Sequence, residues 1–171
     1  MTAIKKIKRD VHELSAKEQN QELKGIVEAI GRAQATIEFN LDGTVLKAND
    51  NFLKCLGYSL PEIQGHHHEM FCEESYVNSV EYKKFWGDLN NGITVSGEFK
   101  RIGKNGKEVW IIASYSPILD GEGKVYKVVK FATDITASKA ELKARTDIMN
   151  LTSIVSESDL KGDILSINDK F

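Results

Sequence analysis

Residues 35–52 read ATIEFNLDGTVLKANDNF, and the pattern on the two sides of Asp42-Gly43 decides the fold of this chain. Polar and apolar residues alternate before the glycine, and the TVLKA segment after it is again typical of a strand. Asp-Gly supplies the positive φ that a tight hairpin needs. The stretch therefore predicts two antiparallel strands, followed by a helix that Asn49 or Asp50 caps through its side-chain oxygen.

The end of the chain repeats this pattern. Residues 153–171 read SIVSESDLKGDILSINDKF, and Gly162 takes the place of Gly43 at a constant offset (162 − 43 = 119 residues). Ungapped similarity at a fixed offset of about domain size indicates duplicated units. We therefore expect one full domain over residues 33–136 and the first hairpin of a second, truncated repeat over residues 154–171.

The segment that follows the first hairpin predicts an α+β domain. Several short helices come first, and Ser59 and Glu62 have the spacing of a capping box at the start of one of them. Three runs rich in β-branched and aromatic residues then follow, at residues 93–102, 108–119 and 125–133. We expect one five-stranded antiparallel sheet with short helices on one face, which leaves the other face for a partner or a flanking helix.

Amphipathic helices are expected on both sides of this domain. Residues 1–32 form an N-terminal segment that Gly31 is placed to end, and a connecting helix covers residues 137–153. Ser138 and Glu141 have capping-box spacing near its start. The apolar residues of the N-terminal segment are spaced by three and four: Ile4, Ile7, Val11, Leu14, Leu23, Ile26, Val27 and Ile30. Both helices can form coiled-coil contacts, which favours a homodimer through the flanking helices.

Composition excludes several classes of protein. The 41% hydrophobic content of 171 residues allows a core in one domain of ordinary size, and the net charge of −2 gives no general attraction to nucleic acid. No apolar run approaches the roughly 20 residues that span a bilayer, and no signal-peptide core precedes the domain. Two cysteines are too few for a disulfide framework. We expect a cytoplasmic protein with no membrane segment and no nucleic-acid partner.

Three stretches together resemble a PAS sensor domain. They are IEFNLDGTVLKANDNFLKCLGYSLPEIQG, FWGDLNNGITVSGEFKRIGKNGKEVWI and SPILDGEGKVYKVVKFATDIT, and they cover roughly residues 33–136 without a large gap. The chain is similar in particular to tandem-PAS methyl-accepting chemotaxis transducers of the biofilm-dispersion and aerotaxis type. The resemblance implies a sensory input module of a bacterial chemotaxis-type signal transducer, with a pocket for a prosthetic group or small ligand between the sheet and the short helices.

The resemblance also implies how a signal leaves the domain. Asp134, Ile135 and Thr136 would pass a change in the sheet to the outgoing helix. In the full-length protein, a downstream signalling domain would then engage a histidine kinase complex.

The segment GHHHEMFC, residues 65–72, suggests a cofactor. Imidazole is an axial ligand of haem, but a second pair of ligands is missing for zinc, so we expect no metal site. Similarity to redox-sensing flavin PAS domains places His67 or His68 and Trp110 at flavin contacts, although Val95 stands where those domains often have a tryptophan. The cofactor stays open between FAD and haem, and the structural alternative is one inward histidine held by hydrogen bonds.

Further pocket candidates come from ring shape and polarity. Three aromatic side chains could line a pocket for a flat ring, and the alternative is a plain core: Phe85, Trp86 and Phe99. Asn49 is a polar anchor at the pocket edge or only a helix cap. Ser114 alternates with Tyr115 on the fourth strand, so only one of them points inward.

The sequence offers no catalytic constellation. The turn GKNGK lacks the spacing of a phosphate-binding loop, and no nucleophile elbow, zinc-protease helix or dinucleotide glycine pattern occurs. We therefore expect no enzyme. The alternative to a ligand-binding sensor is a cofactor-free PAS module for dimerisation and protein docking.

Overall fold

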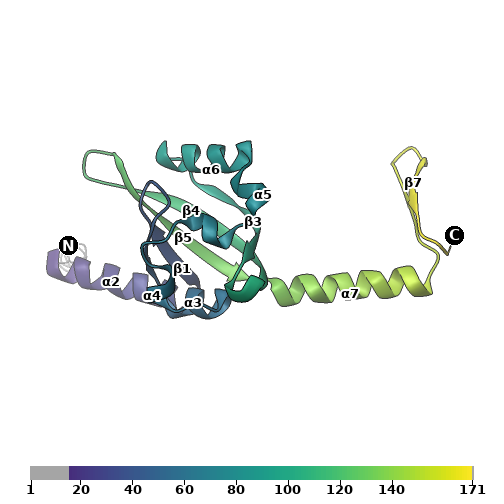
Figure 1. Ribbon diagram of the computed structural model, residues 1–171, viewed down its shortest axis with the longest axis horizontal. Coiled ribbons are helices and arrows are strands. Elements are labelled where there is room, and N and C mark those ends of the chain that lie inside the picture. Colours follow the sequence, from purple (N-terminus) through teal and green to yellow (C-terminus); the bar gives the residue numbers. More distant parts are fainter. Residues whose placement is uncertain (1–15, 171) are drawn as a thin grey trace, which may run out of the picture.

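The computed structural model describes residues 16–170, and a single five-stranded antiparallel sheet forms the centre of its main domain (Figure 1). The strand order is β2-β1-β5-β4-β3, so the first strand pairs with the last. The strands are β1 (Ala35–Phe39), β2 (Val45–Ala48), β3 (Val95–Ile102), β4 (Glu108–Leu119) and β5 (Val125–Asp134). The α+β fold expected from the sequence is confirmed.

The first hairpin forms as its sequence predicts. β1 and β2 pair antiparallel, and Gly43 has a φ of 89° in the turn between them. The backbone N–H of Asn40 donates to the carbonyl of Thr44 (2.8 Å), and that of Gly43 donates to the carbonyl of Asn40 (3.0 Å). A side chain at the turn position would have to adopt a conformation that only glycine adopts easily.

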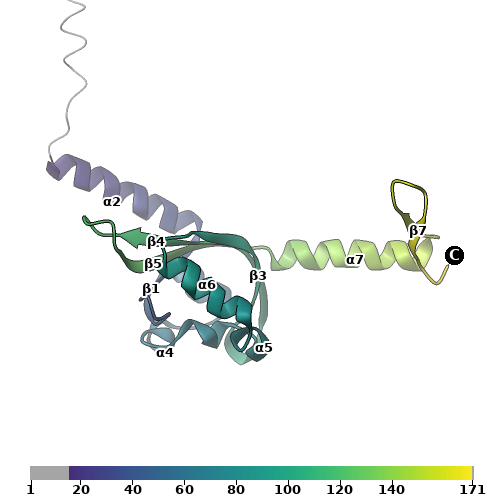
Figure 2. The ribbon, with the colours of Figure 1, turned by 90° about the horizontal axis from the view of Figure 1, so that it is seen from above.

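Short helices cover one face of the sheet, as Figure 2 shows. They are α3 (Asp50–Leu56), α4 (Leu60–Ile63), the 3₁₀ helix η1 (His68–Phe71), α5 (Glu74–Val77) and α6 (Val80–Asn90); a further 3₁₀ turn, η2 (Lys104–Gly106), joins β3 to β4. The predicted capping box is present, because Ser59 N and Oγ both donate to the Glu62 carboxylate. The core lies between this helical layer and the sheet, and we call that side of the sheet the inner face.

The N-terminal helix lies on the opposite, outer face (Figure 2). Helix α2 spans Ala16–Ala33, so the expectation that Gly31 ends it is wrong: Gln34 N still donates to the Ile30 carbonyl (2.9 Å). Four apolar residues of the expected stripe are exposed on α2: Leu23, Ile26, Val27 and Ile30. The rest of that stripe lies outside the described residues: Ile4, Ile7, Val11 and Leu14.

The chain leaves the sheet through a second long helix. Helix α7 (Thr136–Thr152) extends away from the domain and carries at its far end the hairpin of β6 (Ser156–Ser158) and β7 (Ile164–Ile167) (Figure 1). The capping box expected at Ser138 and Glu141 is wrong. The helix begins two residues earlier, where Asp134 Oδ1 accepts a hydrogen bond from Thr136 N (2.8 Å). Glu141 instead accepts from Arg145 one turn later (2.6 Å).

Candidate functional site

The histidine segment runs beside the first hairpin and is held there by its backbone. His68 N donates to the Gly43 carbonyl (2.8 Å), and Val45 N donates to the His66 carbonyl (2.8 Å). A Cβ on Gly43 would lie 2.5 Å from His67 Nε2, so the glycine also makes room for that ring. The hairpin turn thus positions two consecutive histidines on opposite sides of the chain.

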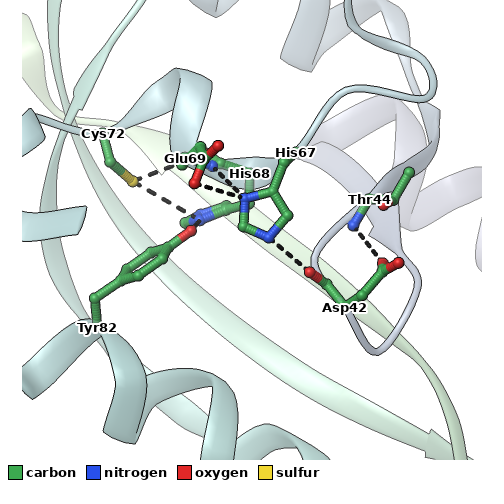
Figure 3. Close-up of polar contacts among 7 residues, drawn as sticks. All are labelled: Asp42, Thr44, His67, His68, Glu69, Cys72 and Tyr82. Atoms are coloured by element: carbon green, nitrogen blue, oxygen red, sulfur yellow. Dashed lines mark hydrogen bonds and ion pairs between the residues drawn. The ribbon is translucent and has the colours of Figure 1, made fainter. Parts of the chain in front are cut away.

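The two histidine side chains have different surroundings (Figure 3). His67 is partly exposed, its Nε2 donates to the carbonyl of Asp42 (2.6 Å), and its Nδ1 accepts from Glu69 N (3.3 Å). His68 is fully buried, and its two ring nitrogens lie 3.0 Å from the Tyr82 hydroxyl and 3.2 Å from the Tyr115 hydroxyl. Only His68 therefore reaches the interior.

The hydrogen-bond network around His68 is compatible with both neutral tautomers. Arg101 Nη2 donates to the Tyr115 hydroxyl (3.0 Å), because a guanidinium cannot accept. In one tautomer the Tyr115 hydroxyl donates to Nε2 and Nδ1–H donates to Tyr82, and in the other both bonds run in the opposite direction. Burial first, and the Arg101 and Lys130 charges next, hold the pKa of His68 well below its usual value, so the ring is neutral near pH 7.

Aromatic rings surround this histidine, and the Cys72 Sγ also lies 3.7 Å from its Nδ1. The Tyr82 and Phe85 rings stack on the imidazole with centroids 5.8 and 5.7 Å away. Trp86 meets its edge at 5.5 Å, and Phe39 meets it at 5.3 Å. Offset and edge-on pairs of this kind stabilise a core by about 0.5–1.5 kcal/mol each beyond their buried area. The ring cluster is thus a rigid polar centre within an apolar shell.

Two cations complete the interior. Arg101 on β3 and Lys130 on β5 are each only 2% exposed. The guanidinium of Arg101 lies 4.7 Å from the Phe99 ring centre, and the Lys130 ammonium lies 4.9 Å from that of Tyr115. Burial, followed by the Arg101 charge, lowers the pKa of Lys130 well below its usual value. Burial also raises the pKa of Tyr115 to about 12, so that its hydroxyl stays protonated.

The structure brings five of the eight candidate ligand contacts together. His68, Phe85 and Trp86 form part of the ring cluster, Phe99 joins it through Tyr115 (5.5 Å), and His67 lies at its rim, 6.2 Å from the Trp86 ring.

The other three candidates lie elsewhere. Trp110 and Ser114 project from the outer face of β4, because the inward positions of that strand are those of Tyr115 and its alternate neighbours. Ser114 Oγ accepts from Ser96 across the strands (2.8 Å). The two residues line no common space with His68, so the expected combination of a histidine and Trp110 around one flavin does not form.

Asn49 is fully engaged in the framework. Its Oδ1 accepts from Thr36 N (2.9 Å) and Phe52 N (3.0 Å), and its Nδ2 donates to the carbonyls of Gly31 and Gln34 (both 2.8 Å). The side chain therefore caps α3 and ties the end of α2 to the sheet. No polar atom of Asn49 is left over for a ligand.

Sequence reasoning missed the polar residues of the interior. Arg101, Lys130 and Tyr82 were not expected to face the core, and Tyr115 was considered only as the alternate of Ser114. Strict alternation along β4 was the available signal, since Val109, Ile111 and Ala113 are all apolar and share a face with Tyr115. No such signal marked Lys130, which stands between Val129 and Phe131 in an apolar strand.

The residues present do not fit haem. Both ring nitrogens of His68 are used by tyrosine hydroxyls, and Nε2 of His67 is used by the Asp42 carbonyl. No group of three or more metal-binding side chains occurs within residues 16–170. A flavin fits the donor set better, because its ring carries carbonyl and nitrogen acceptors. The buried Nε1 of Trp86 and Nε of Arg101 both lack a hydrogen-bond partner among the described residues.

The outgoing helix is attached to the same strand that carries Tyr115. Ile135 N donates to the Trp110 carbonyl (2.8 Å), and Trp110 N donates to Thr136 Oγ1 (3.0 Å). The Lys139 ammonium lies 5.1 Å from the centre of the Trp110 ring. The Asp134 carboxylate accepts from Thr136 N and from the Cys55 thiol (3.5 Å) on α3. The Asp134-Ile135-Thr136 junction thus joins three elements of the domain to α7.

This architecture, with strand order 2-1-5-4-3 and a helical layer around a buried polar centre, defines an α+β sensor-type domain. The family model of the PAS fold matches residues 45–132, and the chain belongs to this family. None of the helices within residues 16–170 is long and apolar enough to cross a membrane.

Two curated relatives agree with this assignment. Over 129 residues the chain is 44% identical to the biofilm dispersion protein BdlA of Pseudomonas aeruginosa, which covers 75% of this chain and 31% of that protein. Over 97 residues it is 31% identical to the aerotaxis receptor of Escherichia coli K12, which covers 57% of this chain and 19% of the receptor. The chain therefore spans a third or less of the length of these relatives, and the expected resemblance to both types is confirmed.

A solved structure supports the fold. The PAS domain of a protein from Colwellia psychrerythraea superposes with a TM-score of 0.59 at 22% identity, covering 67% of this chain and 98% of that domain. At this identity the likeness concerns the fold alone.

Proposed function

We propose that this chain is a sensory input module of a bacterial chemotaxis-type signal transducer. Its interior around His68 binds a prosthetic group or small ligand, and the bound state is passed to α7 through β4 and the Asp134-Ile135-Thr136 junction. The relationship to an aerotaxis receptor supports a redox or oxygen stimulus, with FAD as the first candidate and haem as the less suitable one. Catalysis is not part of this proposal.

One observation carries the proposal: β4 meets the interior and the outgoing helix at once. Its inner side chain Tyr115 contacts His68, and its Trp110 backbone is hydrogen-bonded to the first turn of α7. A shift of β4 that accompanies a change at His68 would therefore move the start of the helix. Such coupling requires that the ligand or redox states favour different positions of β4, since equal affinity for both positions would transmit nothing.

If a flavin is bound, Trp86 and Arg101 would donate hydrogen bonds to it, and Phe85 and Phe99 would contact its ring. The flavin would supply the redox change. The contribution of the chain is to exclude water with its aromatic rings and to hold the neutral His68 ring between the Tyr82 and Tyr115 hydroxyls.

The remaining parts of the proposal concern partners. We propose a homodimer through the flanking helices, because apolar residues of α2 and α7 are exposed: Leu23, Val27, Leu142, Ile148 and Leu151. A downstream signalling domain and a histidine kinase complex would receive the signal in the full-length protein. We propose the cytoplasm as the compartment, where the free thiols of Cys55 and Cys72 would stay reduced.

The test is an absorption spectrum of freshly purified protein, followed by denaturation and mass spectrometry of any released molecule. A flavin or another stoichiometric small molecule supports the sensor function. Asp134→Ala should then leave that molecule bound while it abolishes the ligand-dependent change in α7, followed by amide hydrogen exchange. A protein that releases no molecule and gains none from cell extract contradicts the proposal.

The alternative is a cofactor-free PAS module for dimerisation and docking. The close contacts of the rings around His68 favour it, because Phe85 and Tyr115 already meet at 4.8 Å. A stable dimer with an interior that takes up no small molecule would support this second function.

A further inference from the structure

The interior of the domain contains two cations and no acidic partner for them. Arg101 and Lys130 both project from the inner face and are almost completely buried. Every aspartate and glutamate within the described residues is at least partly exposed. Neither cation forms an ion pair with any of residues 16–170. Natural interiors keep charges when opposite charges or hydrogen bonds replace the lost hydration, and here that replacement is incomplete.

Both cations point toward the same side chain. Arg101 Nη2 donates to the Tyr115 hydroxyl (3.0 Å), and the Lys130 ammonium lies 4.9 Å from the Tyr115 ring centre and 5.4 Å from that of Phe52. Ring faces attract cations but do not neutralise them. The guanidinium of Arg101 therefore places a positive charge beside Tyr115 that no acidic side chain within residues 16–170 pairs with, and Lys130 adds a second one when it is protonated.

Two buried donors near this region are also unpaired. Nε of Arg101 has no hydrogen-bond partner among the described residues, although both terminal nitrogens of the same guanidinium do. Nε1 of Trp86 has none among the described residues either. Buried N–H groups without an acceptor are rare in folded proteins, and each of these calls for an acceptor that the chain does not supply.

We propose that the ligand of this domain carries an anionic group, a carboxylate or a phosphate, which Arg101 and Lys130 hold beside Tyr115. The inference rests on the proposed ligand-binding function and names the chemical class of its ligand. Nε of Arg101 donates to the anion, and the Lys130 ammonium balances its charge. Nε1 of Trp86 donates a hydrogen bond to a second acceptor atom of the ligand. The rings around His68 contact the apolar part of the ligand.

The experiment measures the thermal midpoint of the full 171-residue chain with small anions as probes. Formate, acetate and benzoate are each compared with formamide, acetamide and benzamide at constant ionic strength, and inorganic phosphate is compared with chloride. We expect at least one anion to raise Tm by about 3 °C near saturation, while its neutral counterpart has no effect. A response to carboxylates alone or to phosphate alone identifies the source of the anionic group.

Two variants and a matched control make the test specific. Lys130→Met keeps the volume and removes the charge, so it should raise the Tm of the free protein and remove the response to anions. Arg101→Gln should weaken anion binding at least tenfold. Lys127→Met, on the same strand but paired with Glu38 at the surface, should respond like the wild type.

The outcomes separate the inference from the function on which it rests. Equal stabilisation by benzoate and benzamide would mean that the site binds ligands without selecting an anion, and it would overturn the inference alone. A response that persists in both Lys130→Met and Arg101→Gln would assign the anion to another place and also overturn it. If no anion raises Tm, the inference fails, and the molecule released from purified protein decides the function independently.

Discussion

Asn49 and Asn168, one beside each hairpin of the chain, make three equivalent hydrogen bonds. Oδ1 of Asn49 accepts from Thr36 N, and Oδ1 of Asn168 accepts from Val155 N (2.9 and 3.0 Å). Nδ2 of Asn49 donates to the carbonyls of Gly31 and Gln34, and Nδ2 of Asn168 donates to those of Asn150 and Ser153. All partners are related by the constant offset found in the sequence.

This equivalence assigns a role to α7. The helix stands before the second hairpin as α2 stands before the first, because a carbonyl in the last turn of each helix, that of Gly31 or Asn150, accepts from the amide Nδ2 of the following asparagine. Both hairpins also have their register shift at the same relative place, at Glu38/Phe39 and at Glu157/Ser158. The sequence similarity of the two hairpins is thus accompanied by equivalent hydrogen bonds, and the assignment of the second hairpin to a second repeat stays a prediction.

Asn49→Ala should destabilise the domain by about 2–3 kcal/mol, because it removes the cap of α3 and leaves the backbone N–H of Thr36 on β1 without its partner. Urea unfolding followed by tryptophan fluorescence measures the loss. Asn78→Ala, which removes one exposed amide bond to Glu74, is the control and should cost less than about 1 kcal/mol. Equal losses in the two variants would refute the role of Asn49.

Asp134→Ala should loosen the start of α7 and leave the interior intact. The Asp134 carboxylate accepts from the backbone N–H of Thr136, the first residue of that helix, and losing such a hydrogen bond costs about 1 kcal/mol. Hydrogen exchange should quicken in the first turn of α7 but remain slow around His68. Asp147→Ala, at an exposed pair with Lys143 on the same helix, is the control. Faster exchange throughout the domain would indicate general unfolding instead.

Stability should fall as the pH is lowered from about 7 to about 5. The pKa of His68 is depressed in the folded domain, chiefly by burial, so below its usual value of 6.5 the unfolded chain binds a proton that the folded chain does not. The stability that neutral His68 contributes is therefore fully present above about pH 6.5. It is lost on acidification, and the free energy of unfolding falls by at most about 1.4 kcal/mol per pH unit.

Urea unfolding at several pH values measures this slope. His68→Gln should flatten it, whereas His66→Gln at an exposed position is the matched control. If the wild type and His68→Gln lose stability equally over this range, His68 is not the group responsible.

Trp110→Ala and Trp86→Ala should change different properties of the protein: the first the hydrogen exchange of α7, the second the retention of a small molecule. Trp110 lies on the outer face under Lys139, so its loss should quicken hydrogen exchange at the start of α7 without changing the amount of small molecule that the protein retains. Trp86 belongs to the ring cluster, and its loss should lower that retention at least tenfold. Mass spectrometry of molecules released from equal amounts of folded protein measures retention. Loss of the ligand in Trp110→Ala alone would reverse the assignment of the two faces.

The fold was predictable from the sequence because its signals are local. The Asp42-Gly43 turn, the Ser59–Glu62 capping box and the three strand-like runs each depend on residues close in the chain. The ends of the long helices were harder: Gly31 can end a helix but continues in one here, and a carboxylate outside α7 caps it in place of Ser138.

The site was predictable only in part, because it depends on which residues share a face. His68, Phe85 and Trp86 were singled out by their residue types, and the structure places them in one ring cluster, while their contact with a ligand stays a prediction. Trp110 was misplaced because a large ring is expected inside, although its alternation with Tyr115 indicates the outer face. Lys130 could not be expected in the core, since a lysine in a strand usually faces water.

Helix α7 is hydrogen-bonded to Trp110 at its start and to Asn168 near its end. These bonds set the rotation of the second hairpin about the helix axis, relative to the domain. An α-helix turns by about 100° per residue, so inserting one residue would rotate the second hairpin by about that angle. Inserting seven residues, close to two full turns, would nearly restore its direction. In the proposed signalling function, a change in β4 would therefore reach the second hairpin as a rotation, and the length of the helix would set which side of that hairpin faces it.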